Sequence, residues 1–312
     1  MKRNCGNSTQ VDFDAAYLSL SRTGELKERV TEARRRLEHC DLCPNHCQVN
    51  RFKSIVGTVC QTGALAIVSS YGAHYGEERP LSGWNGSGTI FFSRCNLRCV
   101  FCQNWEISHK GIGREMTAAE LASIMLQLER QGCHNINLVS PSHVVAPLLE
   151  AVEIAALNGL TVPLVYNTGG YDSLETLKLL DGVIDIYMPD MKYGSSDMAH
   201  RYSRAQDYAQ VNQRAVEEMH RQVGDLILSP DGIALKGLLI RHLILPGEIS
   251  NVDQVLRFIA NKLSSNTYIN LMDQYRPCYR AGNYPPLDRP LSRGEYLSAV
   301  ECAHHLGLNR LD

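Results

Sequence analysis

Short apolar runs alternate with amphipathic segments from residue 85 onward. Each apolar run is four to eight residues long, which is typical of strands that are buried on both faces of a parallel sheet. The segments between the runs repeat apolar residues at i, i+3, i+4 and i+7, the spacing of one helix face. This pattern predicts strands at residues 89–92, 136–139, 162–166, 183–188, 238–245 and 268–272.

Capping residues mark where four of the intervening helices begin. Thr117 stands three residues before Glu120, and an apolar stripe starts at Leu121. This spacing is that of a capping box, in which each side chain accepts a hydrogen bond from the other residue's backbone N–H. We expect the same kind of start at the pairs Asp172/Glu175, Ser250/Asp253 and Ser292/Glu295.

The alternation of strands and helices predicts an α/β fold. Six strand-helix units are too few to complete an eight-stranded barrel, so we expect a partial (β/α)6 TIM-like barrel. In such folds the site lies at the carboxyl ends of the parallel strands. Residues that follow the predicted strands are therefore the first candidates for chemistry.

The first 84 residues do not follow this alternation. They contain a charged, helix-like lead-in, a cysteine-rich stretch at 40–60, an apolar run at 64–69 that predicts one strand, and a Gly/Pro-rich link at 80–88. We therefore divide the chain into a helical, Cys-rich metal-binding module, residues 1–84, and a barrel, residues 85–312. The module is expected to pack on the barrel.

Composition and charge exclude several classes of function. The 312 residues carry 31 Lys and Arg against 33 Asp and Glu, and a net charge of −2 offers no basic field for a nucleic acid backbone. No apolar run is long enough to span a bilayer, and the first thirty residues lack the apolar region of a secretory signal. We expect a cytoplasmic protein with no nucleic acid partner and no membrane partner.

The unusual number in the composition is eleven cysteines. A reducing cytosol favours metal ligation over disulfides, so their positions matter more than their count. Four are scattered, and for these we expect packing: Cys5, Cys133, Cys278 and Cys302. For Cys278, just after the sixth predicted strand, the alternative is a thiol that relays a hydrogen atom. The other seven are bunched at positions 40, 43, 47, 60, 95, 99 and 102.

A C-x3-C-x2-C loop, formed by Cys95, Cys99 and Cys102, directly follows the first barrel strand. Three thiolates at this spacing can bind three irons of a [4Fe-4S] cluster and leave the fourth iron without a protein ligand. An open metal position is a place for chemistry. A zinc site and a chance grouping of cysteines are the alternative interpretations.

This loop, with Phe101 before its last cysteine, resembles the signature of the radical S-adenosylmethionine (SAM) superfamily. The resemblance implies a [4Fe-4S] cluster whose open iron binds SAM, and reductive cleavage of SAM to a 5′-deoxyadenosyl radical that abstracts a hydrogen atom. More narrowly, the chain resembles the pyruvate formate-lyase activating enzyme-like branch, particularly members with extra cysteines ahead of the barrel. The likeness extends from residues 40–44 through 86–108 to the LILPG run at 243–247.

In that branch a Met-x-Asp-x-Lys segment ends a strand beside SAM, and residues 188–192 match it with Asp190 and Lys192. The branch also has an Asp-Thr pair that, with the later Asp, helps to bind a monovalent cation. Here the pair is Asn167-Thr168, which keeps an oxygen ligand but removes a charge. The alternative for Asp190 and Lys192 is a mutual surface salt bridge.

Further contacts with SAM are expected from two other segments. The branch's GGE segment, which meets the SAM amino group, is replaced by Ser140-Pro141-Ser142-His143, so Ser140, Ser142 and His143 could supply hydroxyl, backbone and imidazole contacts. Arg241 and His242 interrupt the apolar run at 238–245, and we expect one of them to face the barrel interior. There Arg241 would contact SAM or substrate, or serve as a satisfied polar group of the core.

A second cysteine group, Cys40, Cys43, Cys47 and Cys60, precedes the barrel. Four thiolates, or three with His46, suit a closed zinc site or a second iron-sulfur cluster. A structural staple, an electron-relaying cluster and redox-active thiols are the three interpretations of this group.

Two substrate classes agree with the interpretation of the chain as a radical SAM enzyme. As an activase, the protein would remove a hydrogen atom from a glycine of a glycyl-radical enzyme. The alternative substrate is a peptide side chain or a small molecule. Flavodoxin or ferredoxin is expected as the electron donor, because SAM cleavage needs a low-potential electron. A non-catalytic iron-sulfur or zinc protein is a third interpretation.

Overall fold

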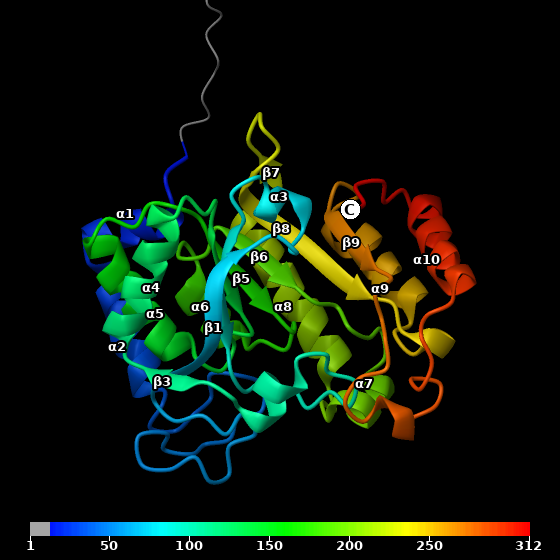
Figure 1. Cartoon of the computed structure of the whole chain (residues 1–312), viewed down its shortest axis with the longest axis horizontal. Coiled ribbons are helices and arrows are strands. Elements are labelled where there is room, and N and C mark those ends of the chain that lie inside the picture. The colour runs from blue at the N-terminus through cyan, green and yellow to red at the C-terminus, as the bar shows by residue number, and fades with distance from the viewer. Residues whose placement is uncertain (1–12) are drawn as a thin grey trace, which may run out of the picture.

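A mixed sheet wrapped by helices forms the centre of the computed structural model, which describes residues 13–312 (Figure 1). Six strands, β2, β4, β5, β6, β8 and β9, run parallel to their neighbours in chain order. The predicted partial (β/α)6 TIM-like barrel is thereby confirmed. The strands are β1 (Ala66–His74), β2 (Ser87–Phe92), β3 (Arg114–Met116), β4 (Ile136–Val139), β5 (Leu164–Thr168), β6 (Ile186–Pro189), β7 (Ile227–Leu228), β8 (Ala234–Leu243) and β9 (Tyr268–Met272).

The strand boundaries differ from the sequence pattern where backbone pairing outweighs hydrophobicity. β5 begins at Leu164, one residue after Pro163, which has no N–H to donate to a neighbouring strand. β8 begins four residues before its apolar run, because β7 pairs antiparallel with residues 234–236. At the opposite edge β1 pairs antiparallel with β2, and β3 with β1.

The helices cover the outer face of the sheet, and two of the four predicted capping boxes are formed. Thr117 and Ser292 each accept from the N–H of the Glu three residues later, and that Glu returns the bond. The other two predicted starts are wrong: the caps are Ser173 and Asn251, one residue later than predicted. The helices are α1 (Ala16–Thr23), α2 (Glu25–Arg35), α3 (Arg79–Ser82), α4 (Ala118–Arg130), α5 (Val145–Leu157), α6 (Leu174–Leu180), α7 (Ser196–Ser203), α8 (Tyr208–Val223), α9 (Val252–Phe258) and α10 (Arg293–His305).

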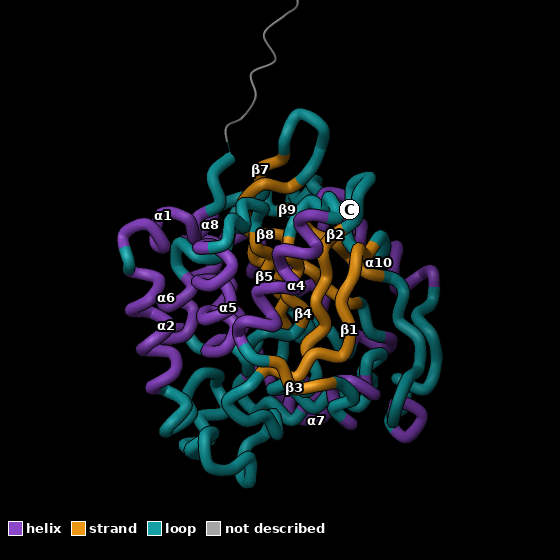
Figure 2. Tube along the Cα trace, turned by 60° about the vertical axis from the view of Figure 1, so that its left-hand side comes forward, coloured by secondary structure: helices purple, strands orange, loops and turns teal. Residues whose placement is uncertain are grey.

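Alternate residues along the strands belong to two different cores. In β5, Leu164 and Tyr166 join the large core between sheet and helices, whereas Val165 points into the barrel and packs with Ile186 and Leu239. Figure 2 shows α2, α5 and α6 together on one side of the strands. Because strand side chains alternate between faces, polar residues that replace the inward apolar ones line the barrel interior.

The N-terminal residues reach the barrel at two places. α1 and α2 pack on α5, and the loop between α2 and β1 lies at the lower edge in Figure 1, near β3. There the Asn45 side chain donates to the Asn96 carbonyl at 2.9 Å, and Arg51 donates to the His143 carbonyl at 2.8 Å. The division at residue 84 stays a prediction, and β1, from the first part, pairs with β2 of the second.

Candidate functional site

The cysteine loop leaves the carboxyl end of β2 with polar groups directed at all three sulfur atoms. The Leu97 N–H lies 3.4 Å from Cys95 Sγ, and the Ser203 hydroxyl donates to Cys99 Sγ at 2.9 Å. Cys102 Sγ lies 3.2 Å from the Ser108 hydroxyl. Such hydrogen bonds stabilise a thiolate and tune a cluster that it binds.

The protonation of these thiols depends mainly on burial. Burial raises the pKa of Cys95 to about 12 and that of Cys99 to about 11, and the neighbouring cysteines act in the same direction. In the part of the chain that the structure describes, no three His, Cys, Asp or Glu side chains converge to hold one metal ion. A [4Fe-4S] cluster places each cysteine on a different iron, so three thiols from one loop with outer hydrogen bonds fit its chemistry.

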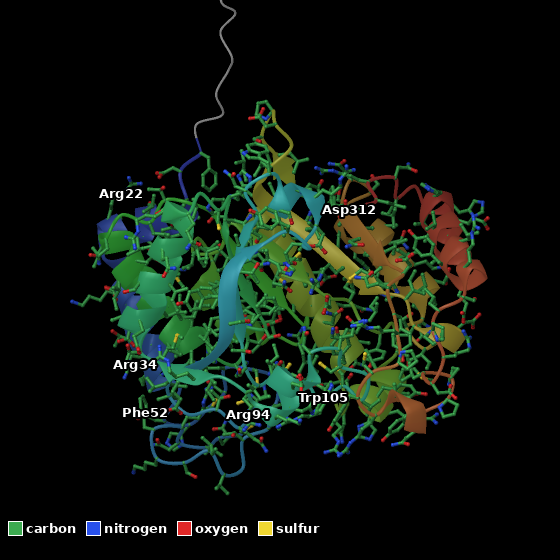
Figure 3. All side chains as sticks on the ribbon, in the orientation of Figure 1. Arg22, Arg34, Phe52, Arg94, Trp105 and Asp312 are labelled. Atoms are coloured by element: carbon green, nitrogen blue, oxygen red, sulfur yellow. The ribbon has the colours of Figure 1, made fainter. Side chains whose placement is uncertain are left out.

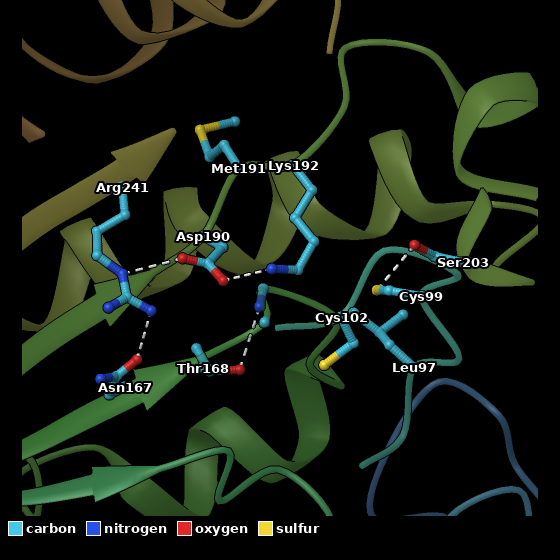
Figure 4. A network of polar contacts seen from close by, with 12 residues as sticks. Leu97, Cys99, Cys102, Asn167, Thr168, Asp190, Met191, Lys192, Ser203 and Arg241 are labelled. Carbon is cyan, nitrogen blue, oxygen red and sulfur yellow. Dashed lines mark hydrogen bonds and ion pairs between the residues drawn. The ribbon is translucent and has the colours of Figure 1, made fainter. Parts of the chain in front are cut away.

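A buried ion network lies beside the loop, as Figure 4 shows. Asp190, just beyond β6, accepts from Lys192 Nζ at 2.5 Å and from Arg241 Nε at 3.0 Å. The side chain of Asp190 is 12% exposed and that of Lys192 is 19% exposed, so the pair is not a surface salt bridge. Arg241 also donates to Asn167 Oδ1 at 2.8 Å. A guanidinium therefore stands beside Asn167, where the resemblance implied a monovalent cation.

Opposite charges keep both partners of this pair ionised. Burial acts to raise the pKa of Asp190, but Arg241 and Lys192 outweigh it and lower the pKa below the usual value. Burial acts to lower the pKa of Lys192. The charge of Asp190, and to a smaller extent that of Cys99, outweighs this effect and raises the pKa above its usual value. The ammonium thus lies between the carboxylate and the cysteine loop, as in Figure 4.

Hydroxyl groups beside this network are occupied by internal hydrogen bonds. Thr168 donates to Asp172 at 2.6 Å and lies 2.9 Å from the Ser142 hydroxyl. Tyr166 donates to the other oxygen of Asp172 at 3.0 Å. Burial raises the pKa of Asp172, while the hydroxyl donors oppose that rise. Thr168 and Ser142 are therefore fixed at the barrel mouth, and Asp172 orients Thr168 instead of capping α6.

The remaining predicted cofactor contacts lie around the loop. Phe101 is buried and makes edge contacts with Tyr193 and Tyr275. Ser140 follows β4 with a left-handed φ of 60°, so the chain turns sharply there. The His143 imidazole bonds to the Ser93 carbonyl at 3.0 Å and supports the start of the cysteine loop. The roles of these residues toward SAM stay predictions.

The N-terminal cysteines lie next to the cysteine loop. Arg98, within the cysteine loop, donates from Nη2 to the Val59 carbonyl at 2.5 Å, one residue before Cys60. Donors face two of the N-terminal sulfurs at 3.6 Å, Asn45 toward Cys43 and Arg51 toward Cys40. Burial raises the pKa of Cys43 to about 12, with Cys60 and Cys40 acting in the same direction. Burial also raises the pKa of Cys47, and Cys60 and Cys40 act in the same direction. The four thiols are therefore neighbours, but within the described residues they do not converge on one metal position.

The scattered cysteines are not gathered into either group. Cys133 is buried in the main core, and Cys302 on α10 lies 3.7 Å from a carboxylate oxygen of Asp253. Cys278 is half-buried after β9. Cys5 lies outside the described residues.

Sequence reasoning missed four polar residues of the barrel interior. Asn137 in β4 and Asn270 in β9 each interrupt an apolar strand, which is a signal that the pattern offered. Glu77 and Glu78, in the link between β1 and α3, gave no such signal. Their position follows from tertiary contacts, Glu77 with Arg241 of β8 and Glu78 with Asn270 of β9. Ser203, the donor to Cys99, was missed as well.

A surface pocket of about 660 Å³ lies away from these residues. It is bounded by the end of β8, α9 and α10. None of the predicted cofactor-binding residues lines this pocket, so its size gives no reason to move the candidate site.

Comparison with known proteins agrees with this geometry. The family described as the radical SAM superfamily matches residues 89–233. The uncharacterized protein MJ0674 of Methanocaldococcus jannaschii is 30% identical over 312 residues, covering 96% of this chain and 84% of that protein. The chain belongs to the radical SAM superfamily. Membership implies a [4Fe-4S] cluster and SAM, which agrees with the position of the cysteine loop at the carboxyl end of the first barrel strand.

Other similarities of this radical SAM protein are weaker. Uncharacterized protein MJ0808 of the same archaeon is 26% identical over 267 residues, 79% of this chain and 73% of that protein. Streptococcus suis SuiB, solved bound to its precursor peptide SuiA, is similar with a TM-score of 0.43 and 12% identity. The match covers 68% of this chain and 45% of that one, so it concerns part of the fold alone. Among the described residues, no helix has the length and apolar character needed to cross a membrane.

Proposed function

We propose that the protein reductively cleaves SAM and abstracts a hydrogen atom from a substrate held in the barrel. The observation that carries this proposal is the position of Lys192 and Asp190 beside the cysteine loop, at the open end of a six-stranded barrel. Cys95, Cys99 and Cys102 would hold the cluster. When bound, the cluster and SAM supply a 5′-deoxyadenosyl radical.

Each neighbouring side chain has a physical task in this proposal. Lys192 offers a buried ammonium to the methionine carboxylate of SAM, and Asp190 offers carboxylate oxygens to its amino or hydroxyl groups. The aromatic contacts of Phe101 with Tyr193 and Tyr275 keep water from the loop. Arg241 fixes Asp190 and Asn167 in one orientation. Such fixed geometry directs a reactive centre at one C–H bond.

The activating enzyme-like resemblance supports a glycine of a glycyl-radical enzyme as the substrate. The alternative, a peptide side chain or a small molecule, is supported by the departures at residues 140–143 and at Asn167, where the chain lacks the activating enzymes' residues. A panel of glycyl-radical enzymes and their glycine-loop peptides separates the two. Stimulated SAM cleavage with an organic radical signal in the partner supports the activase. Unchanged SAM cleavage with every member of the panel supports the alternative.

A basic face over the cysteine loop supports docking of an acidic electron carrier such as flavodoxin or ferredoxin. His109 lies 3.1 Å from the Cys99 carbonyl. Burial lowers its pKa, the hydrogen bond to the Cys99 carbonyl opposes that effect, and Arg98, Arg280 and Arg204 add to it. The Tyr279 ring lies 4.6 Å from the His109 ring, and the Arg280 guanidinium lies 5.2 Å from the Tyr279 ring. Arg204→Glu with Arg280→Glu should slow turnover with flavodoxin and leave turnover with dithionite unchanged, because a small reductant needs no docking face. Equal slowing with both reductants contradicts this docking.

For Cys40, Cys43, Cys47 and Cys60 we propose a second metal site, closed by four thiolates. Metal analysis of anaerobically purified protein distinguishes zinc from a second iron-sulfur cluster. With zinc, Cys43→Ala should lower stability while SAM cleavage by the remaining folded protein persists. If the group binds a second iron-sulfur cluster, Cys43→Ala should contain about half the iron of the parent protein. The monovalent cation stays a prediction.

The test of the main proposal is anaerobic incubation with dithionite and SAM, followed by chromatography for 5′-deoxyadenosine. Cys95→Ala, Cys99→Ala and Cys102→Ala should each abolish the product. Cys302→Ala is the matched control, because that thiol lies on α10 outside both groups. Product formed by any of the three loop variants, or none formed by the reconstituted parent protein, contradicts the proposal.

A further inference from the structure

Two adjacent glutamates lie in the barrel interior, below the ion network. Glu77 and Glu78 belong to the link between β1 and α3, and they contact the two last strands of the barrel. Arg241 Nη1 of β8 lies 3.9 Å from Glu77 Oε2. Asn270 of β9 donates to Glu78 Oε1 at 3.0 Å. The link thus bridges the first and last strands of an otherwise open barrel.

Buried polar atoms here have no partner within the described residues. They are Glu78 Oε2 and both amide atoms of Asn137. Glu78 is 6% exposed and Asn137 is fully buried. Ile136 and Leu138, on either side of Asn137, belong to the core outside the barrel, so the amide points inward. Buried polar groups normally have partners, and unpartnered ones in a cluster indicate that a ligand supplies them.

Carboxylates outnumber permanent cations in this interior. Burial raises the pKa of Glu77, while Arg241, His74 and the Asn137 side chain oppose that rise. Arg241 is buried among Asp190, Glu78 and Glu77, all of which raise its pKa against the opposing effect of burial. Among the described residues, Lys192 is the other permanent cation of the network and is bonded to Asp190. The His74 imidazole lies 3.4 Å from Glu77 Oε1. Three carboxylates therefore share two permanent cations and one imidazole, and Glu78 has a neutral amide as its hydrogen-bond partner. A buried carboxylate without a counter-charge is costly unless a bound group compensates it.

We propose that Glu77, Glu78 and Asn137 form a subsite for a cationic nitrogen group of the substrate, an ammonium or a guanidinium. The free carboxylate oxygen and the Asn137 amide oxygen accept its hydrogen bonds, and the positive charge balances the interior. This inference rests on the proposed function, since the subsite lies below Asp190 and Arg241, where a substrate would meet the radical. It favours a substrate with a lysine-like or arginine-like group.

Binding of small probes to the reconstituted protein tests the subsite without turnover. The probes are n-butylammonium and n-butylguanidinium, with n-pentanol as the neutral control of similar size. N-acetyl-lysine methylamide, with its norleucine analogue as control, distinguishes a peptide side chain from a free amine. Ligand-observed NMR should show cations binding at least about tenfold more tightly than neutral controls. The inference is overturned if the free amines and the lysine derivative both bind no more tightly than their neutral controls.

Variants place the binding at these residues. Glu78→Gln keeps the size of the side chain and removes its charge, and it should abolish the tenfold preference. Its melting temperature should be equal or higher, because an uncompensated buried charge is lost. Glu217→Gln, the same change on the exposed surface of α8, should alter neither measurement. A merely structural glutamate would instead leave the cation preference intact and lower the melting temperature.

Asn137→Leu is a second variant that should weaken cation binding while the chain stays folded. Cation preference retained by both Glu78→Gln and Asn137→Leu overturns the subsite. The parent protein distinguishes this inference from the proposed function. If it cleaves SAM but binds cations no better than n-pentanol, the subsite alone is wrong. If it prefers cations but forms no 5′-deoxyadenosine, the proposed radical chemistry is wrong instead.

Discussion

Asp190→Asn is the substitution that tests the buried ion network most directly. Asp190 joins two cations, with N–O distances of 2.5 Å to Lys192 and 3.0 Å to Arg241. At an effective dielectric constant of about 20, each attraction is worth about 6 kcal/mol before desolvation is subtracted. Removing one partner of a buried pair leaves an uncompensated charge and costs about 3–5 kcal/mol. We expect the free energy of unfolding to fall by that amount.

The assay is urea unfolding of the metal-free chain with its cysteines kept reduced. The matched control is Glu175→Gln, because Glu175 lies 2.7 Å from Lys178 but both side chains are more than 60% exposed. An exposed pair contributes about 0–1 kcal/mol, so the control isolates the effect of burial at a similar distance. Both variants replace a carboxylate by its amide and keep the side chain's shape.

A double variant checks that the cost comes from the stranded cation. Asp190→Asn combined with Lys192→Met removes both charges of the pair, and it should be more stable than Asp190→Asn alone. The reasoning is refuted if Asp190→Asn is within about 1 kcal/mol of the control. It is also refuted if the double variant loses the sum of the two single losses, since coupled partners are not additive.

Three further predictions concern acid stability, helix capping and the cluster. Burial lowers the pKa of His242 to about 4, so the unfolded chain binds a proton near pH 6.5 that the folded chain does not. The free energy of unfolding should therefore fall by about 2 kcal/mol between pH 7 and pH 5. In urea unfolding at these two pH values His242→Asn should remove that loss, and an equal loss in the variant contradicts the prediction. Thr117→Ala should lower the free energy of unfolding by about 1 kcal/mol in the same assay, since one capping bond is lost, and no change refutes this. Ser203→Ala should lower the reduction potential of the cluster, because the hydrogen bond to Cys99 is removed; an EPR-monitored redox titration with unchanged potential would speak against it.

Local patterns were sufficient to predict the strand order and to name candidate residues that the structure brings together. The six parallel strands follow chain order, so each apolar run became the neighbour of the next. The cysteine loop and the Asp190–Lys192 pair were found because their residues are adjacent in sequence. The capping boxes at Thr117 and Ser292 formed for the same reason, since a cap depends on residues within one helical turn.

Side-chain choices at the barrel mouth could not be read from the sequence. Asp172 was predicted to cap α6, but it accepts from Thr168 and Tyr166 instead. Either of Arg241 and His242 could have faced the interior. The arrangement of β8 directs Arg241 to Asp190, whereas His242 bonds to the Met191 carbonyl. These outcomes depend on how neighbouring strands are staggered, which local sequence does not encode.

By itself the sequence determined the partial barrel, the cysteine loop and the charged pair beside it, because each arises from residues close together in the chain. Only the tertiary structure decided that Glu78 would meet Asn270, 192 residues away, and that one guanidinium would lie among three carboxylates. The closure of the barrel brings these groups together. Their charge balance is a property of the enclosed interior, where water does not compensate an unpaired ion.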